Sequence, residues 1–336
     1  MADASANEGP AAASPAPVVR MFGWSVLAAM AAYLINAVLT FWFGLPGAGG
    51  LFGWQSYGPP GPMMWLQVAI YVLLPLAACL QVLRTPHVAL RDDAKRVSDA
   101  NAFLIRAAFW VVLLVGLSDG VISFLRVEGF LPAIFGDEMA IELGKSDYRG
   151  RYVHVPFVIL GIILATFTRT LGFTWLALMV VVAELLIVFS RFIFSYEQAF
   201  MSDLVRFWYA ALFLFASGHT LLEDGHVRVD VFYSNFRRST QGRVNAVGSI
   251  LLGISLCWTI LIVGMWTKSS IIISPILIFE TTQTGFGMYV KYFMAGFIGV
   301  FAISMMIQFV SMLFDSVADS RNEPGGHEDH HAGHIG

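Results

Sequence analysis

Long stretches of apolar residues, separated by short polar segments, fill most of this chain. A transmembrane helix needs about 20 predominantly apolar residues to cross a hydrocarbon core about 30 Å thick. Eight stretches meet this requirement: 21–43, 63–83, 103–125, 153–169, 172–194, 203–222, 244–266 and 286–314. The pattern predicts an all-α integral membrane protein with about eight transmembrane helices.

The fourth of these stretches is the shortest, and only Arg169 to Leu171 separate it from the fifth. It could instead be a re-entrant or tilted segment, which would leave seven spans and reverse the orientation of one half of the chain.

Basic residues favour eight spans, because Lys and Arg concentrate in cytoplasmic segments. With a cytoplasmic N-terminus, the inside set has eleven members: Arg20, Arg84, Arg91, Lys95, Arg96, Arg169, Arg228, Arg237, Arg238, Arg243 and Arg321. The outside set has five: Arg126, Lys145, Arg149, Arg151 and Lys268. We therefore expect both termini to lie in the cytoplasm.

The composition agrees with a membrane protein. Of 336 residues, 57% are hydrophobic and 13% are charged, and the mean hydropathy is +0.70. Soluble domains have about 45–50% apolar and about 25% charged residues. The net charge of -3 does not suggest a nucleic-acid partner. Cys79 and Cys257 lie in apolar stretches, so we expect buried thiols and no disulfide framework.

The segments outside the spans differ in character. Residues 1–20 are rich in Ala, Pro and Ser, which predicts a disordered tail. Residues 316–336 end in a polar, His-rich tail that is either simply solvated or binds a transition metal loosely. Residues 126–152 alternate acids and bases and contain a short amphipathic helix pattern, as expected for a segment on the membrane surface.

Ionisable residues inside the membrane cost a few kcal/mol each at mid-depth, so they usually have partners or functions. Arg106 and Asp119 lie near opposite ends of the third span, where we expect Arg106 to reach the cytoplasm and Asp119 to lie close to the outer face. Glu184 lies near the middle of the fifth span, and the sequence shows no partner for it.

Further charges flank the short link between the fifth and sixth spans, which makes these spans antiparallel neighbours. Arg191 lies seven residues after Glu184 and on the same helix face. We expect Arg191 to meet Glu197 or Asp203, either as a structural pair or as part of a surface for another subunit. Asp203 and Arg206, three residues apart, share a face at the start of the sixth span.

The polar segment after the sixth span does not have the spacing of a metal, haem or catalytic site. His219 and His226 are seven residues apart on either side of an expected helix end, and no HExxH pattern is present. No phosphate-binding loop of the GxxxxGK[ST] type occurs. Val229, Phe232 and Phe236 recur at helical spacing, which predicts an amphipathic helix on the cytoplasmic surface, in contact with membrane lipids.

The residues around this segment resemble a known family. The sequence "GHVRVD" spans 225–230, and it follows Arg191–Phe192, Glu197 and Asp203 at the positions that the pattern requires. In this membrane context the chain resembles the DctQ-like small membrane subunit of tripartite ATP-independent periplasmic (TRAP) transporters, over about residues 172–314. Two features depart from the pattern: the two acids are separated in sequence, and some 170 residues precede the unit.

The resemblance divides the chain into a tail (1–20), an extension of about four transmembrane helices (21–170), a DctQ-like unit (171–315) and a C-terminal tail (316–336). It also marks His226, Arg228 and Asp230 of "GHVRVD" as structural or interface residues. The acids and arginines described above are the other candidates for such roles: Glu184, Arg191, Glu197, Asp203 and Arg206.

The resemblance implies a scaffold subunit and not an enzyme. A periplasmic protein would capture an organic acid, typically a carboxylate, and a large membrane subunit would move it with sodium across the bacterial inner membrane. Substrate and sodium would bind the partner chains, so we expect no cofactor in this one. Two other classes remain: the membrane anchor of an electron-transfer enzyme that uses His219 and His226, and a stand-alone carrier.

Overall fold

The computed structural model describes residues 16–54, 56–59, 61–169, 172–222, 233–281 and 287–325. Within these ranges eight helical segments are long and apolar enough to cross a membrane, which confirms the predicted fold class. They are α1 (Pro17–Phe41), α2 (Pro62–Arg84), α3 (Leu90–Val127), α6 to α7 (Ser146–Phe167), α8 (Phe173–Phe194), α9 (Ala199–Leu222), α10 to α11 (Arg238–Met265) and α13 (Lys291–Ser320).

Shorter elements connect the spans or make up the fourth and the seventh of them. They are η1 (Ala48–Phe52), α4 (Leu131–Phe135), α5 (Asp137–Leu143), α6 (Ser146–Arg149), η2 (Gly150–His154), α7 (Val155–Phe167), η3 (Tyr233–Asn235), α10 (Arg238–Gly248), η4 (Ser249–Ile254), α11 (Ser255–Met265) and α12 (Ile273–Leu277). The fourth and seventh spans each contain a π-helical turn, η2 and η4. The predicted surface segment 126–152 forms the three short helices α4, α5 and α6.

Helix α3 is much longer than the predicted span of 103–125. It has 38 residues, which corresponds to about 57 Å at 1.5 Å per residue. The predicted span left out the first turns of this helix, which are rich in charged residues. The helix continues there because Asp93, Ala94 and Val97 are buried against neighbouring helices, while Lys95 and Arg96 point to the exposed face.

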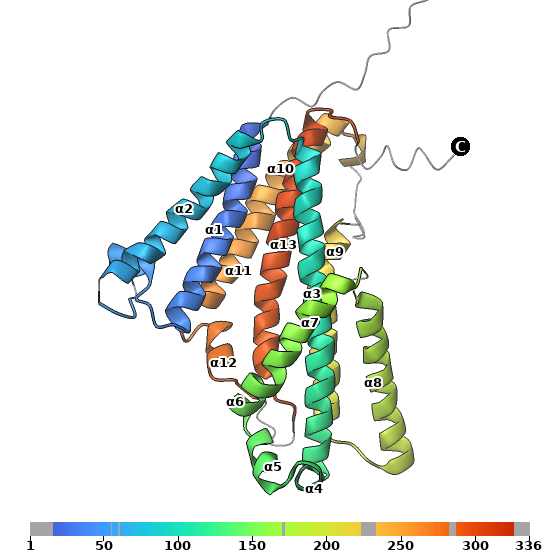
Figure 1. Ribbon diagram of the computed structural model, residues 1–336. Helices are drawn as coiled ribbons and strands as arrows, with labels where there is room; N and C mark the ends of the chain where they lie inside the picture. Colours follow the sequence, from blue (N-terminus) through green and yellow to red (C-terminus); the bar gives the residue numbers. More distant parts are fainter. Residues whose placement is uncertain are drawn as a thin grey trace, which may run out of the picture.

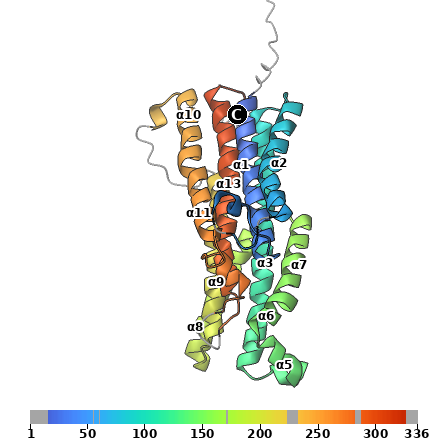
Figure 2. The same ribbon diagram turned by 90° about the vertical axis from the view of Figure 1, so that its left-hand side faces the viewer.

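The helices surround α3 and α13, which lie side by side at the centre (Figures 1 and 2). α9 packs on both of them, α1 and α2 form one edge of the bundle, and α8 lies at the opposite edge (Figure 1). The main core cluster contains Phe109 and Val115 of α3, Phe207 and Phe215 of α9, and Phe297 of α13. The predicted N-terminal extension therefore shares one core with the predicted DctQ-like unit.

The start of α1, the start of α3 and the end of α13 lie at the same end of the bundle. Arg20 Nε donates to Asp93 Oδ2 at 2.6 Å, and Arg91 Nη2 donates to Asp319 Oδ1 at 2.8 Å. This arrangement agrees with an even number of spans. Of the two cysteines, Cys257 is buried as predicted, but Cys79 is only half-buried.

Glycine allows α3 and α7 to approach closely. A Cβ atom on Gly161 would lie 2.8 Å from the backbone nitrogen of Val111 and 2.9 Å from its Cα. Because backbone atoms cannot move aside cheaply, we expect Gly161→Ala to lower the free energy of unfolding by about 1–3 kcal/mol, the usual cost of overpacking. Thermal unfolding of the purified protein in detergent measures this effect.

Gly248→Ala is the matched control for that prediction. No atom lies within 4 Å of a Cβ at Gly248. Alanine also favours helix over glycine by about 1 kcal/mol, so this variant should unfold at the wild-type temperature or above it. Equal destabilisation by the two substitutions would contradict the close contact between α3 and α7.

Candidate functional site

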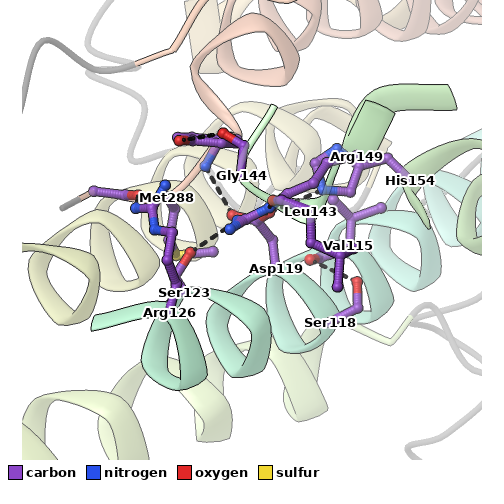
Figure 3. Close-up of polar contacts among 12 residues, drawn as sticks. Val115, Ser118, Asp119, Ser123, Arg126, Leu143, Gly144, Arg149, His154 and Met288 are labelled. Carbon is purple, nitrogen blue, oxygen red and sulfur yellow. Dashed lines mark hydrogen bonds and ion pairs between the residues drawn. The ribbon is translucent and has the colours of Figure 1, made fainter. Parts of the chain in front are cut away.

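A cluster of buried polar side chains joins the first half of the chain to the second (Figure 3). It lies at the end of the bundle away from the three helix termini described above. Its centre consists of Asp119 from α3, Arg149 from the end of α6 and His154 from the end of η2, all 0% exposed. In a regular α-helix, residues five positions apart point in different directions. The wider π-helical turn of η2, with its i→i+5 hydrogen bonds, brings Arg149 and His154 toward the same carboxylate.

Arg149 makes three hydrogen bonds in the cluster. Its Nη1 donates to Asp119 Oδ1 at 2.8 Å and to Ser123 Oγ at 3.1 Å, and its Nε donates to the carbonyl oxygen of Leu143 at 2.6 Å. Its Nη2 is buried without a hydrogen-bond partner. The guanidinium carbon lies 4.3 Å from the centre of the Tyr289 ring, so the aromatic face offsets part of the lost hydration.

His154 connects Asp119 to α13. Its Nε2 lies 3.1 Å from Asp119 Oδ1, and its Nδ1 lies 2.6 Å from the hydroxyl oxygen of Tyr292. A neutral imidazole protonated on Nε2 satisfies both contacts, because it donates to the carboxylate and accepts from the tyrosine hydroxyl. The charges of Asp119 and Arg149 then balance each other, and His154 contributes a further hydrogen bond to the carboxylate.

Two carboxylates hold successive backbone amides of the segment that leads into α13. The nitrogen of Met288 donates to Asp203 Oδ2 at 3.1 Å, and the nitrogen of Tyr289 donates to Asp119 Oδ2 at 2.8 Å. Arg126 Nη2 donates to the carbonyl oxygen of Gly287 at 2.8 Å. The segment 287–290 is thus held by α3 from one half of the chain and by α9 from the other.

A second contact between the two halves lies nearby. The Tyr196 hydroxyl, in the link between α8 and α9, donates to Glu128 Oε1 at 2.5 Å, just beyond the end of α3. Burial and this hydrogen bond raise the pKa of Tyr196 to about 12, so the hydroxyl stays protonated and keeps donating across the physiological pH range.

The chemistry of the polar cluster is that of a fixed structural connection. Its donors and acceptors are used up within the protein, apart from Arg149 Nη2, and Asp119 accepts three hydrogen bonds. Among the residues that the structure describes, no group of three or more His, Cys, Asp or Glu side chains could hold a metal ion.

Of the acids and arginines that the sequence singled out, the structure brings Arg191 and Glu197 together and places the others apart. Arg191 Nε lies 3.4 Å from Glu197 Oε2, with 64% and 46% of the two side chains exposed. Asp203 is buried and holds the amide of Met288, whereas Arg206 is exposed on α9. Glu184 is exposed on the outer face of α8.

Three of the predicted residues, His226, Arg228 and Asp230, lie outside the described ranges, as does most of the predicted amphipathic helix with Val229 and Phe232. His219 lies in the last turn of α9.

Sequence reasoning missed the polar cluster, although signals for it were present. It placed Asp119 close to the outer face, but it did not pair this carboxylate with His154 or with Arg149. It also named no partner for Arg106, whose Nε donates to the carbonyl oxygen of Ala165 at 2.9 Å, near the end of α7.

A second set of ion pairs was also missed, at the other end of the bundle. There Arg91 of α3 and Arg238 of α10 both contact Asp319 of α13, at 2.8 and 2.9 Å. The contact between Arg91 and Asp319 again connects the two halves of the chain.

Comparison with known proteins identifies the second half. Residues 178–319 match the family of tripartite ATP-independent periplasmic transporters, DctQ component. No curated protein and no solved structure matches the chain. The match runs from within α8 to near the end of α13, and the helices α1 to α7 precede it. Over residues 178–319 this chain is a member of the DctQ family, the small membrane component of TRAP transporters, and it has an N-terminal multi-helix extension.

Proposed function

We propose that this chain is the scaffold subunit of a sodium-coupled secondary transporter that imports an organic acid, typically a carboxylate, across the bacterial inner membrane. Beside the family match, one observation carries the proposal: buried charges of this chain form ion pairs within the chain. Asp119 pairs with Arg149, and Asp93 pairs with Arg20. Such pairs fix helices in place. A transport pathway instead needs polar groups that line a water-filled route.

The outer face of α8 is the surface that we assign to the large membrane subunit. Val181, Leu185 and Phe189 are 55%, 49% and 54% exposed on this helix, and Glu184 is exposed among them. Glu184 is the twelfth of the 22 residues of α8, which corresponds to mid-membrane depth. An ionisable group in lipid at this depth costs several kcal/mol. A partner helix that donates hydrogen bonds to the carboxylate would remove that cost.

The other expected partner is the periplasmic substrate-binding protein. With both chain termini in the cytoplasm, α4 to α6 would lie on the periplasmic side. Ile134 and Ile141 are 58% and 65% exposed there, next to Asp137 and Glu138 in the first turn of α5. We propose this mixed apolar and acidic surface as the docking site for the soluble partner.

Purification from native membranes tests the proposed function. The full chain with an affinity tag, extracted in mild detergent, should bring down a larger multi-span membrane protein at a constant ratio. In liposomes, uptake of an organic acid should require this chain, the large subunit, the periplasmic protein and a sodium gradient together.

Three results would overturn the proposal. The first is recovery of the chain from native lipid as a stable, isolated protein. The second is uptake by the chain alone, which would make it a stand-alone carrier. The third is stoichiometric haem in the absorbance spectrum, which would instead support an electron-transfer anchor using His219 and His226.

A further inference from the structure

A cleft of about 440 Å³ opens between α1, α2 and α11 at the end where α1 and α2 are joined. The two helices diverge toward this end (Figure 1). The lining is mostly aromatic and aliphatic, with Tyr33, Phe52, Trp54, Tyr71, Trp258 and Trp266 among its residues. Its size lies within the range of about 300–1,000 Å³ that is typical of small-molecule sites.

Fixed contacts hold the cleft open. At the far end, Arg20 of α1 donates to the carbonyl oxygen of Thr85, just after α2, at 2.5 Å. At the near end, Gln67 of α2 accepts from the backbone nitrogen of Gly47 and donates to Thr40 Oγ1, both at 2.8 Å. The cleft is therefore part of the folded protein, and a ligand would not have to create it.

The mouth of the cleft carries a positive charge among hydroxyl and indole groups. The Nζ atom of Lys268 lies 5.1 Å from the centre of the Tyr57 ring, and the Lys268 backbone nitrogen donates to the Tyr57 hydroxyl at 3.2 Å. Tyr57 itself lines the cleft. The hydroxyls of Thr267 and Ser269 lie 3.0 Å apart in the same turn.

Aromatic residues mark the depth of this mouth. Trp54 and Trp266 contact each other with ring centres 5.7 Å apart. Tryptophan concentrates at the level of the lipid head groups, and a lysine at that level attracts phosphate. The apolar cleft thus lies where a phospholipid would place its acyl chain, and Lys268 lies where the phospholipid would place its phosphate.

We propose that this cleft binds one membrane phospholipid, with an acyl chain between α1, α2 and α11 and the phosphate at Lys268. The site does not depend on the proposed transport function, since it is built from α1, α2, α11 and the loops that adjoin them. A protein partner is the less favoured occupant. The membrane-spanning part of α2 contains no charged residue before Arg84. It therefore has no charged group at mid-membrane depth for a partner protein to contact, whereas α8 has Glu184.

The test measures phospholipid that stays bound to the full chain after extraction in mild detergent and washing. Native mass spectrometry gives the number of lipids per chain, and extraction with lipid analysis identifies the head group. We expect one retained phospholipid in the wild type. Lys268→Gln should reduce its occupancy about fivefold, the effect of losing one lysine–phosphate attraction near a membrane surface. Val72→Trp should reduce it further, because Val72 lines the cleft.

Two matched controls distinguish the site from general effects. Leu73 is 58% exposed, as Val72 is 57% exposed, but it does not line the cleft, so Leu73→Trp should retain the lipid. Lys145 is exposed on the loop between α5 and α6, and Lys145→Gln should also retain it.

Two outcomes would overturn the lipid site. One is a wild-type protein without retained phospholipid, or equal retention in the cleft variants and the controls. The other is capture of a protein instead of a phospholipid by a photo-crosslinker placed at Val72 in native membranes.

Discussion

Replacing Arg149 by methionine should lower the free energy of unfolding of this protein by about 3–5 kcal/mol, which is the usual cost of removing one partner from a buried ion pair. The two side chains of the pair with Asp119 are 0% exposed, and their contact is 2.8 Å long. Without the guanidinium, the carboxylate of Asp119 would stay buried with only His154 and the Tyr289 amide as donors. Thermal and denaturant unfolding in detergent measure the loss.

A double-mutant cycle separates the pair from its surroundings. The Asp119→Asn, Arg149→Met protein carries no unpaired charge, so it should recover part of the stability that Arg149→Met loses. Lys145→Gln is the surface control, because Lys145 and Glu142 are 52% and 37% exposed in their ion pair, and it should unfold like the wild type. An Arg149→Met protein as stable as the control would show that the polar cluster does not hold the two halves together.

The lengths of the apolar stretches made the spans predictable, but charged residues near the ends of the helices made those ends hard to place. A run of about 20 apolar residues has no stable alternative to a helix in lipid, so all eight spans were found. The start of α3 was missed because Lys95 and Arg96 look like loop residues in the sequence. In the structure they occupy the exposed face of a helix whose other face, with Asp93 and Val97, is buried.

The polar cluster could not be derived from spacing along the chain. Asp119 lies 30 residues before Arg149 and 170 residues before Tyr289. Their meeting depends on the path of α4 to α6 and on the π-helical turn η2, and neither follows from hydrophobic periodicity. By contrast, Arg191 and Glu197 lie across one short link between antiparallel helices, so local geometry was enough to suggest that contact.

The arrangement of the core explains how the extension can form one unit with the DctQ-family region. α3 contributes Phe109 and Val115 to the cluster that also contains Phe207 and Phe297 of the DctQ-family region. Ion pairs join the same two regions at one end of the bundle, and the polar cluster joins them at the other. Because α3 is fixed at both ends and along its length, it should move together with the DctQ-family region. This packing favours an extension that makes the small subunit wider and stays rigidly attached to it.

Glu184→Lys should abolish most of the binding between this chain and the large membrane subunit. If the carboxylate meets a hydrogen-bond donor or a cation on the partner, the substitution removes a buried, charge-assisted contact and introduces a repulsive or unpaired charge. Loss of one partner from such a contact costs about 2–5 kcal/mol, which lowers the affinity about 30-fold or more. Quantitative mass spectrometry of proteins that co-purify with the tagged chain measures the effect.

Glu184→Leu decides between a partner and lipid as the environment of α8. Against lipid, this change removes a costly charge from mid-membrane depth, so the variant should be more stable and should co-purify with the same partners as the wild type. Against a partner helix, it leaves a donor without an acceptor, and the yield of the complex should fall. Lys145→Gln serves as the control, because Lys145 lies on the loop between α5 and α6, away from α8, and its exposed pair with Glu142 contributes little when solvated. A normal complex with Glu184→Leu, together with higher stability, would refute the assignment of this face to the large subunit.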